Sequence, residues 1–513
     1  MPRGRNDVDP KASSMTTILL DGPLAWREVA AVADGAALAL SPAALDRIAG
    51  ARAIVEAIVD KGLRAYGVNT GVGALCNVII DRADQARLSK NLIFSHAVGV
   101  GPLLPRRETR AIMTAALNNY AHGYSGVSVA LAEQILALLN ADIVPEVPAQ
   151  GSVGYLSHMG HIALVLIGEG RARLGEETLS GADALARIGR RPLVLGAKEG
   201  LSLVNGSPCV TGLSTLVLAR AHNLMAWADL VAALTFEAAR GQIIAFDARP
   251  LALKRSPGLQ AVGERLRAYL SGSAILAQAA GRQTQDPLSL RTIPHVHGAV
   301  LDTLDQIEAT IERELASVSD NPVVTGTPDA PEVFSEAHAV APALALAMDQ
   351  AGIALAEVAA MAERRLDRLV NPLVSGLPAF LARDSGAASG LMIAQYSAVS
   401  LVAENRRLAA PASLDGGITS ALQEDHLCHP TPSALKALKI LDNAEAVLGI
   451  ELIAAAQAHD LLDERLAMGA GTGRLQARLR ALIPPYADDR PLGEDMAKAA
   501  ALIRGESPAA ILA

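Results

Sequence analysis

The chain has 513 residues, carries a formal net charge of −8, and is 51% apolar but only 3% aromatic. This length accommodates about three domains or one elongated body. The apolar share comes from Ala, Leu, Val and Ile, a mixture that favours closely packed helices over an aromatic-rich β-sandwich. The acidic balance, with no basic run longer than pairs such as Arg406-Arg407, argues against nucleic acid as a partner.

The cysteines and the N-terminus indicate a cytoplasmic protein. Cys76, Cys209 and Cys428 are too few and too scattered for a disulfide framework or a zinc site, so we interpret them as free thiols. Charged residues interrupt the apolar runs that could span a bilayer, and no membrane partner is expected. Residues 1–14 are polar and lack the apolar centre of a secretory signal, so we expect a disordered tail.

Residues 15–206 mix short extended pieces with helices and form the expected N-terminal domain. Residues 17–22 predict a strand that ends in a turn. Ser41 has the character of an N-cap, with Pro42 at the first helical position, and the helix should end near Lys61-Gly62. A glycine-rich loop follows over residues 67–73.

From residue 207 onward the pattern is long, Ala-rich and amphipathic. Apolar residues at helical spacing predict a bundle of long helices over 207–462. The expected helices cover 213–240, 303–316, 341–369, 390–409 and 432–462. Residues 463–513 are more polar and form an expected C-terminal helical segment. The sequence therefore predicts a mainly α fold, with a smaller mixed N-terminal domain and a long central helical bundle.

Six segments in order along the chain resemble the aromatic amino acid lyases, the family of histidine, phenylalanine and tyrosine ammonia-lyases. They are YGVNTGVG (66–73), NLIFSH (91–96), KEGLSLVNG (198–206), QDPLSLR (285–291), SVSDNP (317–322) and QEDH (423–426). Each segment alone is a weak signal. The resemblance extends from about residue 17 to 492 and implies an enzyme that eliminates ammonia from an aromatic-type amino acid.

Residues 148–158, PAQGSVGYLSH, resemble the family's catalytic segment with three residues absent. In the family, Gly-Ser-Val-Gly is followed by Ala-Ser-Gly, which cyclises to the electrophile 4-methylidene-imidazol-5-one (MIO). Here Gly154 is joined directly to Tyr155, so these two residues are expected to flank MIO. Cyclisation of residues 151–153 instead would require the crowded, β-branched Val153 to attack. Either the modified residue was left out of the written chain, or this homologue has lost the chemistry.

Elimination of ammonia needs an electrophile that activates the amine and a base that takes the β-proton. By the resemblance Tyr66 is the base, and its pKa of about 10 would have to fall for that role. Asn205 and Gln285 would order the prosthetic group and the amine. Arg291 would bind the substrate carboxylate, for which a guanidinium has the right bidentate geometry. Without the resemblance, Tyr66 would be an ordinary packing tyrosine and Asn205 a loop residue.

His96 and Glu424 bear on the choice of substrate. A His–Glu pair can hold an imidazole ring by hydrogen bonds at both edges, and histidine-specific members resemble this chain at both positions. We therefore favour histidine, which would give urocanate, over tyrosine or phenylalanine. Glu424 could instead cap a helix or form an ion pair. An aminomutase on the same scaffold and an inactive homologue both stay open as alternatives.

Several positions near the expected site depart from the family pattern. Leu288 replaces a tyrosine, His338 falls where a phenylalanine is usual, and Tyr155 replaces an aspartate. Leu288 and His338 are therefore expected to contact the substrate in a retuned pocket, unless the changes reflect loss of activity. Histidines also gather in the chain, but their spacing matches no metal-ligand pattern and no metal is expected; they are His158, His161, His295, His297 and His338. The resemblance further implies a homotetramer with active sites shared between subunits and a small-molecule amino acid substrate.

Overall fold

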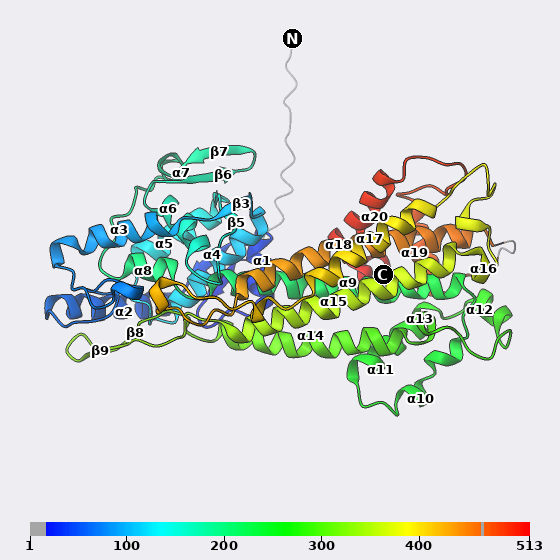
Figure 1. Cartoon of the computed structure of the whole chain (residues 1–513), viewed down its shortest axis with the longest axis horizontal. Coiled ribbons are helices and arrows are strands. Elements are labelled where there is room, and N and C mark those ends of the chain that lie inside the picture. Colours follow the sequence, from blue (N-terminus) through cyan, green and yellow to red (C-terminus); the bar gives the residue numbers. More distant parts are fainter. Residues whose placement is uncertain (1–16, 463–465, 513) are drawn as a thin grey trace, which may run out of the picture. The chain divides into compact units, whose positions relative to one another are not determined.

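The structure is a computed structural model that describes residues 17–462 and 466–512 (Figure 1). The tail expected over residues 1–14 lies outside the described residues. The described chain is mainly helical, which confirms the expected fold class. It groups into two compact units. The first contains the described residues through Thr215, Glu312–Ala341 and Gly417–Leu427, and the second contains Leu216–Ile311, Pro342–Gly416 and the described residues from Cys428 onward.

The first unit combines helices with small, separate sheets. Its helices are α1 (Trp26–Ala33), α2 (Pro42–Asp60), α3 (Gln85–His96), α4 (Arg106–Ala121), α5 (Val129–Asn140), α6 (Ser157–Leu166), α7 (Gly181–Arg187) and α8 (Glu199–Val204). Its strands are β1 (Ile18–Leu20), β2 (Leu38–Leu40), β3 (Val100–Leu103), β4 (Val144–Pro145), β5 (Pro148–Gln150), β6 (Arg171–Leu174), β7 (Glu177–Ser180), β8 (Val323–Gly326) and β9 (Pro331–Phe334). β1 and β2 pair in parallel, and the pairs β3–β5, β4–β6, β6–β7 and β8–β9 are antiparallel.

Helix α2 shows how local sequence sets an element of this unit. The Ser41 side chain accepts a hydrogen bond from the Ala44 backbone N–H at 3.0 Å, and Pro42 occupies the first helical position, as predicted. The apolar face of α2, which includes Ile54, Val55 and Ile58, packs into a cluster with Val68 and other buried residues. The loop after α2 is thereby anchored at Val68, which lies within the glycine-rich segment.

A buried ion pair fixes α8 against the segment before β8. Lys198 Nζ lies 2.9 Å from Asp320 Oδ2, and both side chains are at most 1% exposed. Ser202 Oγ donates to the same carboxylate oxygen at 2.9 Å. Burial lowers the pKa of Lys198, although the Asp320 carboxylate acts in the opposite direction. Lys198 is the N-cap of α8, so this pair holds the N-terminal end of the helix in place, and removal of either partner would leave an uncompensated buried charge.

Long helices dominate the second unit. α15 (Pro342–Val370), α17 (Met392–Leu408) and α18 (Pro430–Asp460) pack side by side, as Figure 1 shows. The other helices are α10 (Ala248–Leu251), α11 (Pro257–Tyr269), α12 (Ala274–Ala279), α13 (Leu288–Arg291), α16 (Pro372–Ser375), α19 (Ala470–Arg480), α20 (Gly493–Gly505) and α21 (Pro508–Leu512). α9 (Pro208–Ala238) and α14 (Ile293–Leu315) contribute to this unit as well. The predicted long helices are present, and their ends are shifted by a few residues except at the start of α14.

Helix α14 differs most from the prediction, because it begins at Ile293 rather than at 303. Pro294 and two histidines obscure the apolar period there. Pro294 lies in the first turn of the helix, where the missing N–H removes no intrahelical hydrogen bond. The C-terminal segment is also more helical than its polar composition suggests, since it forms α19, α20 and α21.

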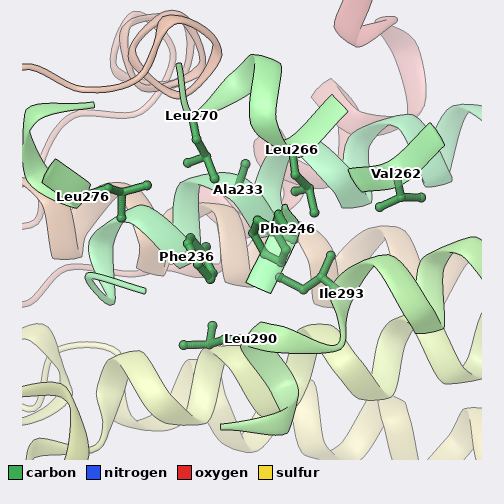
Figure 2. Close-up of a cluster of buried hydrophobic side chains, with 10 residues drawn as sticks. Ala233, Phe236, Phe246, Val262, Leu266, Leu270, Leu276, Leu290 and Ile293 are labelled. Carbon is green, nitrogen blue, oxygen red and sulfur yellow. The ribbon is translucent and has the colours of Figure 1, made fainter. Parts of the chain in front are cut away.

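A core cluster in the second unit anchors the short helix α13. Figure 2 shows Phe236 and Phe246 at its centre, with ring centroids 4.5 Å apart. Leu290 of α13 and Ile293 of α14 extend into the same cluster and are at most 2% exposed. The burial of Leu290 therefore sets which face of α13 stays accessible, and Arg291 follows it directly in the chain.

Two helical stretches meet the length and composition of a membrane span, contrary to the expectation that charges interrupt every candidate. They are Glu199–Ala238 and Pro342–Val370. The most apolar window of the first is entirely buried in the fold, and 61% of the second is buried. Core helices of a helical bundle have this composition because they are covered on most sides.

Candidate active site

A cavity of about 920 Å³ opens within the first unit. Its walls come from the loop after α2, the end of α3, residues 153–156, the end of α8, the loop around β9 and residues 419–424. Of the residues predicted from the sequence, five line it, and they come from distant parts of the chain. These are Tyr66, His96, Tyr155, Asn205 and Glu424.

Tyr66 is half-buried in the loop after α2, and its hydroxyl oxygen accepts a hydrogen bond from the Gly73 backbone N–H at 3.2 Å. Gly67 follows with φ +63°, a conformation that favours glycine, and a Cβ there would lie 2.2 Å from Leu201 Cδ2 and force that side chain to move. Burial raises the pKa of Tyr66, as do the negative charges of Glu424 and Cys76, while the Gly73 N–H acts against them. Within this unit the pKa of Tyr66 thus moves opposite to what a base requires.

Asn205 caps the C-terminus of α8 and is 8% exposed. Its side-chain N–H₂ group donates to the Asn321 carbonyl oxygen at 2.6 Å and to Asp320 Oδ1 at 3.3 Å. The amide is therefore oriented by the 317–322 segment rather than by its own turn. The Lys198–Asp320 ion pair stabilises this arrangement, because Lys198 binds Asp320 Oδ2 while the Asn205 amide donates to Asp320 Oδ1.

His96 and Glu424 lie on the walls of the same cavity, with the side chains held differently. Burial lowers the pKa of His96, which favours a neutral ring at pH 7. His96 Nδ1 lies 3.0 Å from Ser95 Oγ. Glu424 is half-buried, and its Oε2 accepts a hydrogen bond from the Tyr155 hydroxyl at 3.3 Å. A hydrogen-bond donor in the cavity can therefore meet a carboxylate that a neighbouring side chain already orients.

Residues 151–157 form a tight turn on the cavity wall. Ser152 Oγ donates to the Tyr155 carbonyl oxygen at 2.8 Å and accepts from the Gly154 N–H at 3.1 Å. Leu156 has φ 78° and ψ −73°, and the Ser157 N–H bonds back to the Tyr155 carbonyl at 3.2 Å. The three-residue turn formed by residues 155–157 is strained. A backbone conformation such as that of Leu156 costs about 1–3 kcal/mol.

The strain falls beside the point where the chain is three residues shorter than the family pattern. The Leu156 N–H donates to the Val204 carbonyl oxygen at 3.0 Å, which holds the turn next to Asn205. Three more residues between Gly154 and Tyr155 would lengthen the segment directly ahead of this turn. The strained turn, the adjacent Asn205 amide and the open cavity fit a cyclised tripeptide at this position.

A complete Ala-Ser-Gly does occur elsewhere, at residues 388–390 of the second unit. The backbone N–H groups of Ser389 and Gly390 both donate to the Asp489 carboxylate, at 2.8 and 3.0 Å. Cyclisation would require the Gly390 nitrogen to leave this carboxylate and attack the Ala388 carbonyl carbon. The second tripeptide is thus held in an open, hydrogen-bonded form and does not substitute for the one missing after Gly154.

The remaining predicted residues lie outside the cavity wall. Gln285, Leu288 and Arg291 belong to the second unit, where the Gln285 amide oxygen, turned toward Arg291, accepts from its guanidinium at 2.6 to 3.2 Å. Leu288 is 62% exposed. His338 is in the first unit, but its ring is mostly exposed and bonds to the carboxylate of Glu336.

Two charged residues of the cavity were missed from the sequence, namely Arg64 and Glu336. Neither lies in one of the motifs, and no local pattern distinguishes them from surface charges. Asn321 was part of a recognised motif but received no role. Among the described residues, no group of three or more His, Cys, Asp or Glu side chains is placed to hold a metal ion.

The sequence profile of the aromatic amino acid lyases matches residues 24–481. The chain belongs to this family. The family's prosthetic group is MIO, which forms autocatalytically from Ala-Ser-Gly. The relative from Anaeromyxobacter sp. (strain K), a histidine ammonia-lyase, is 42% identical over 95% of this chain and 99% of its own length. The histidine ammonia-lyase of Symbiobacterium thermophilum is 41% identical over 97% and 98%.

Solved structures of family members have the same fold. Histidine ammonia-lyase from Trypanosoma cruzi superposes with a TM-score of 0.89 at 33% identity, covering 97% of this chain and 95% of that chain. Tyrosine aminomutase from Streptomyces globisporus gives a TM-score of 0.90 at 33% identity, covering 95% and 97%. The scaffold of this family therefore appears in both ammonia-lyases and aminomutases.

Proposed function

We propose that this lyase eliminates ammonia from histidine, with MIO as its electrophile. The observation that carries the proposal is the convergence of Tyr66, Asn205 and Glu424 on one cavity whose wall includes the 153–156 segment. Similarity to histidine ammonia-lyases over almost the whole chain supports the same substrate. Phenylalanine is a weaker candidate, because a carboxylate at Glu424 suits an N–H donor better than an apolar ring. Tyrosine is a weaker candidate, because the relatives that match over almost the whole chain are histidine ammonia-lyases.

Each side chain has a role that follows from its chemistry. Tyr66, as phenolate, takes the β-proton on its phenolate oxygen and becomes the neutral phenol. Glu424 accepts a hydrogen bond from one imidazole N–H, and neutral His96 is a further polar contact of the ring. Asn205 presents its amide oxygen to the reacting centre, since its N–H₂ group is occupied by Asn321 and Asp320. When present between Gly154 and Tyr155, MIO supplies the electrophilic carbon that activates the amine as a leaving group.

Gln285 and Arg291 complete the proposed site from another subunit. A guanidinium suits the substrate carboxylate, and the Gln285 oxygen that faces it would preset its orientation. We propose a homotetramer in which several chains contribute to each site, as the family resemblance implies. Leu288 and His338 stay proposed contributors to substrate choice. A cytoplasmic location likewise stays a proposal, supported by cysteines that are too few and too scattered for a disulfide framework.

Incubation with L-histidine, L-tyrosine and L-phenylalanine tests the substrate. Release of ammonia, together with near-ultraviolet absorbance of a conjugated acrylate, should be fastest with histidine at equal concentration. Ammonia release from none of the three would contradict the lyase proposal.

An aminomutase is the second candidate, favoured by the similarity to tyrosine aminomutase. Such an enzyme returns the amine to the β-carbon. Chromatography of the same reactions separates the two functions, because a β-amino acid product would identify a mutase and acrylate alone a lyase.

A further inference from the structure

We infer that Glu336 is a second substrate-binding carboxylate, and that it makes this site selective for amino acids whose side chain carries two N–H donors, such as a protonated imidazole. This inference deepens the proposed function and rests on it. Glu336 belongs to none of the recognised motifs, and its position in the fold gives it this role.

The loop after β9 fixes Glu336 to the wall that carries Asn205. The Glu336 backbone N–H donates to Asn321 Oδ1 at 2.9 Å. The Asn321 carbonyl oxygen in turn accepts from the Asn205 side chain at 2.6 Å. Glu336 is thus coupled through a single residue to the amide beside the reacting centre, and it lines the same cavity as Glu424.

Only one of the two Glu336 carboxylate oxygens has a hydrogen-bond partner among the described residues. Its Oε2 is bonded to both the backbone N–H and the ring Nδ1 of His338. Its Oε1 is buried and has no hydrogen-bond partner among the described residues. The side chain is 20% exposed and faces the cavity. Because a buried anionic oxygen without a donor is costly, the geometry calls for a donor that arrives with the ligand.

The charges of the cavity favour the same kind of ligand. Glu336 and Glu424 are its carboxylates, while His96 is held toward its neutral form by burial. Arg64 is exposed, and its guanidinium donates to the backbone and side-chain oxygens of Asn77 at 3.3 and 3.2 Å. Two carboxylates against one engaged guanidinium leave a negative pocket, which stabilises a cationic or donor-rich side chain.

Each carboxylate is oriented by a residue at which this chain departs from the family pattern. Tyr155 donates to Glu424 Oε2, and His338 engages Glu336 Oε2. In both cases the partner occupies one carboxylate oxygen and leaves the other for a ligand. A protonated imidazole has two N–H groups and can satisfy one carboxylate with each.

Binding of unreactive analogues tests this directly. The probes are 3-(imidazol-4-yl)propionate and 3-phenylpropionate, which share the acid but differ in N–H donors and lack the α-amine. Isothermal titration of the purified full-length protein compares wild type, Glu336→Gln and the control Glu332→Gln, an exposed residue on β9. Loss of one charge-assisted hydrogen bond should weaken the imidazole probe about tenfold in Glu336→Gln and the phenyl probe less than about twofold. Glu332→Gln should change neither.

The two N-methylated isomers of the imidazole probe sharpen the assignment. The isomer methylated at the nitrogen that faces Glu336 should bind wild type more weakly than the parent probe. The same isomer and the parent probe should bind Glu336→Gln equally well, because the Glu336 carboxylate that accepted this N–H is gone. Equal weakening of imidazole and phenyl probes in Glu336→Gln, or no change in either, would overturn the role of Glu336.

These outcomes separate the inference from the proposed function. If the imidazole preference depends on Glu336 but no amino acid releases ammonia, the binding role stands and the lyase proposal fails. If histidine is deaminated and Glu336→Gln keeps the full preference for imidazole, the lyase proposal stands and the inference fails.

Discussion

Tyr66 owes its position to its own loop, through the Gly73 N–H and the close packing of Gly67 on Leu201. Its surroundings in the first unit raise its pKa, so the positive character needed for ionisation must come from groups that complete the site. MIO and the proposed Arg291 of another subunit are the candidates for that contribution. The loop therefore positions the proposed base independently of the groups that would lower its pKa.

Replacement of Tyr66 by phenylalanine tests its role as the base. Tyr66→Phe should lower kcat by about 10²–10⁴-fold, the usual contribution of a general base. The phenyl ring keeps the packing, so the midpoint of thermal unfolding should stay close to that of wild type. Tyr124→Phe is the matched control, because Tyr124 is exposed in the same unit and outside the cavity wall. Full activity of Tyr66→Phe would show that Tyr66 is not the base.

The charge of Glu424 should be visible in the pH dependence. Burial is the largest cause of the raised pKa of Tyr66, and the Glu424 carboxylate raises it further because a second anion is disfavoured nearby. Glu424→Gln removes that charge, so the pKa of Tyr66 should fall and the alkaline rise of kcat/KM should move to lower pH. Phenylalanine is the substrate of choice, since it makes no imidazole contact with Glu424. A rise at unchanged or higher pH would contradict this coupling.

At the scale of elements, the turn at residues 151–157 is the place where MIO would lie. Its strained Leu156 lies where three residues are absent, and the Val204 carbonyl holds it beside Asn205. A protein that carries MIO has the mass of the printed chain plus Ala, Ser and Gly, less two waters. We expect this mass by electrospray mass spectrometry of the intact protein. A mass equal to the printed chain would identify an inactive homologue.

Helix α13 depends on its core anchor to present Arg291. Leu290 is 2% exposed in the cluster around Phe236 and Phe246 (Figure 2). Leu290→Ala should destabilise the second unit by about 2–5 kcal/mol through the cavity it creates. It should also raise KM for histidine if Arg291 binds the substrate carboxylate as proposed, because Arg291 directly follows Leu290.

The matched control for Leu290→Ala is Leu253→Ala. Leu253 is 82% exposed, so its truncation should change stability by less than about 0.5 kcal/mol. Chemical denaturation gives the stabilities and steady-state kinetics give KM. An unchanged KM in Leu290→Ala would show that substrate binding does not depend on the packing of α13.

At the scale of the whole molecule, large apolar side chains remain exposed on several helices of the second unit. They include Leu346 and Ile353 of α15, Leu373 of α16, and Ile393 and Tyr396 of α17. Exposed apolar residues on this scale are typical of surfaces that another subunit covers.

Light scattering after size-exclusion chromatography should therefore give the mass of four copies of the 53.1 kDa chain. Ile393→Asp should shift the protein toward smaller species and lower its activity, since a charge is costly in an apolar interface. A clean monomer with full activity would contradict the shared active site.

The mainly α architecture could be predicted from the chain because helices and caps depend on neighbours a few positions apart. Ser41 and Pro42 mark the start of α2, and the helical spacing of apolar residues marks α15, α17 and α18. The start of α14 was missed, because Pro294 and the nearby histidines interrupt the apolar period without interrupting the helix.

The contacts of the candidate site depend on the tertiary structure. Asn205 bonds to Asn321 across 116 positions, and Tyr155 bonds to Glu424 across 269. Motif resemblance pointed to Asn205 and Glu424, but nothing local indicated Glu336, which enters the cavity only because Asn321 holds its loop. A helix follows from short-range periodicity, whereas a pocket forms where distant loops converge, and that convergence exists only in the folded chain.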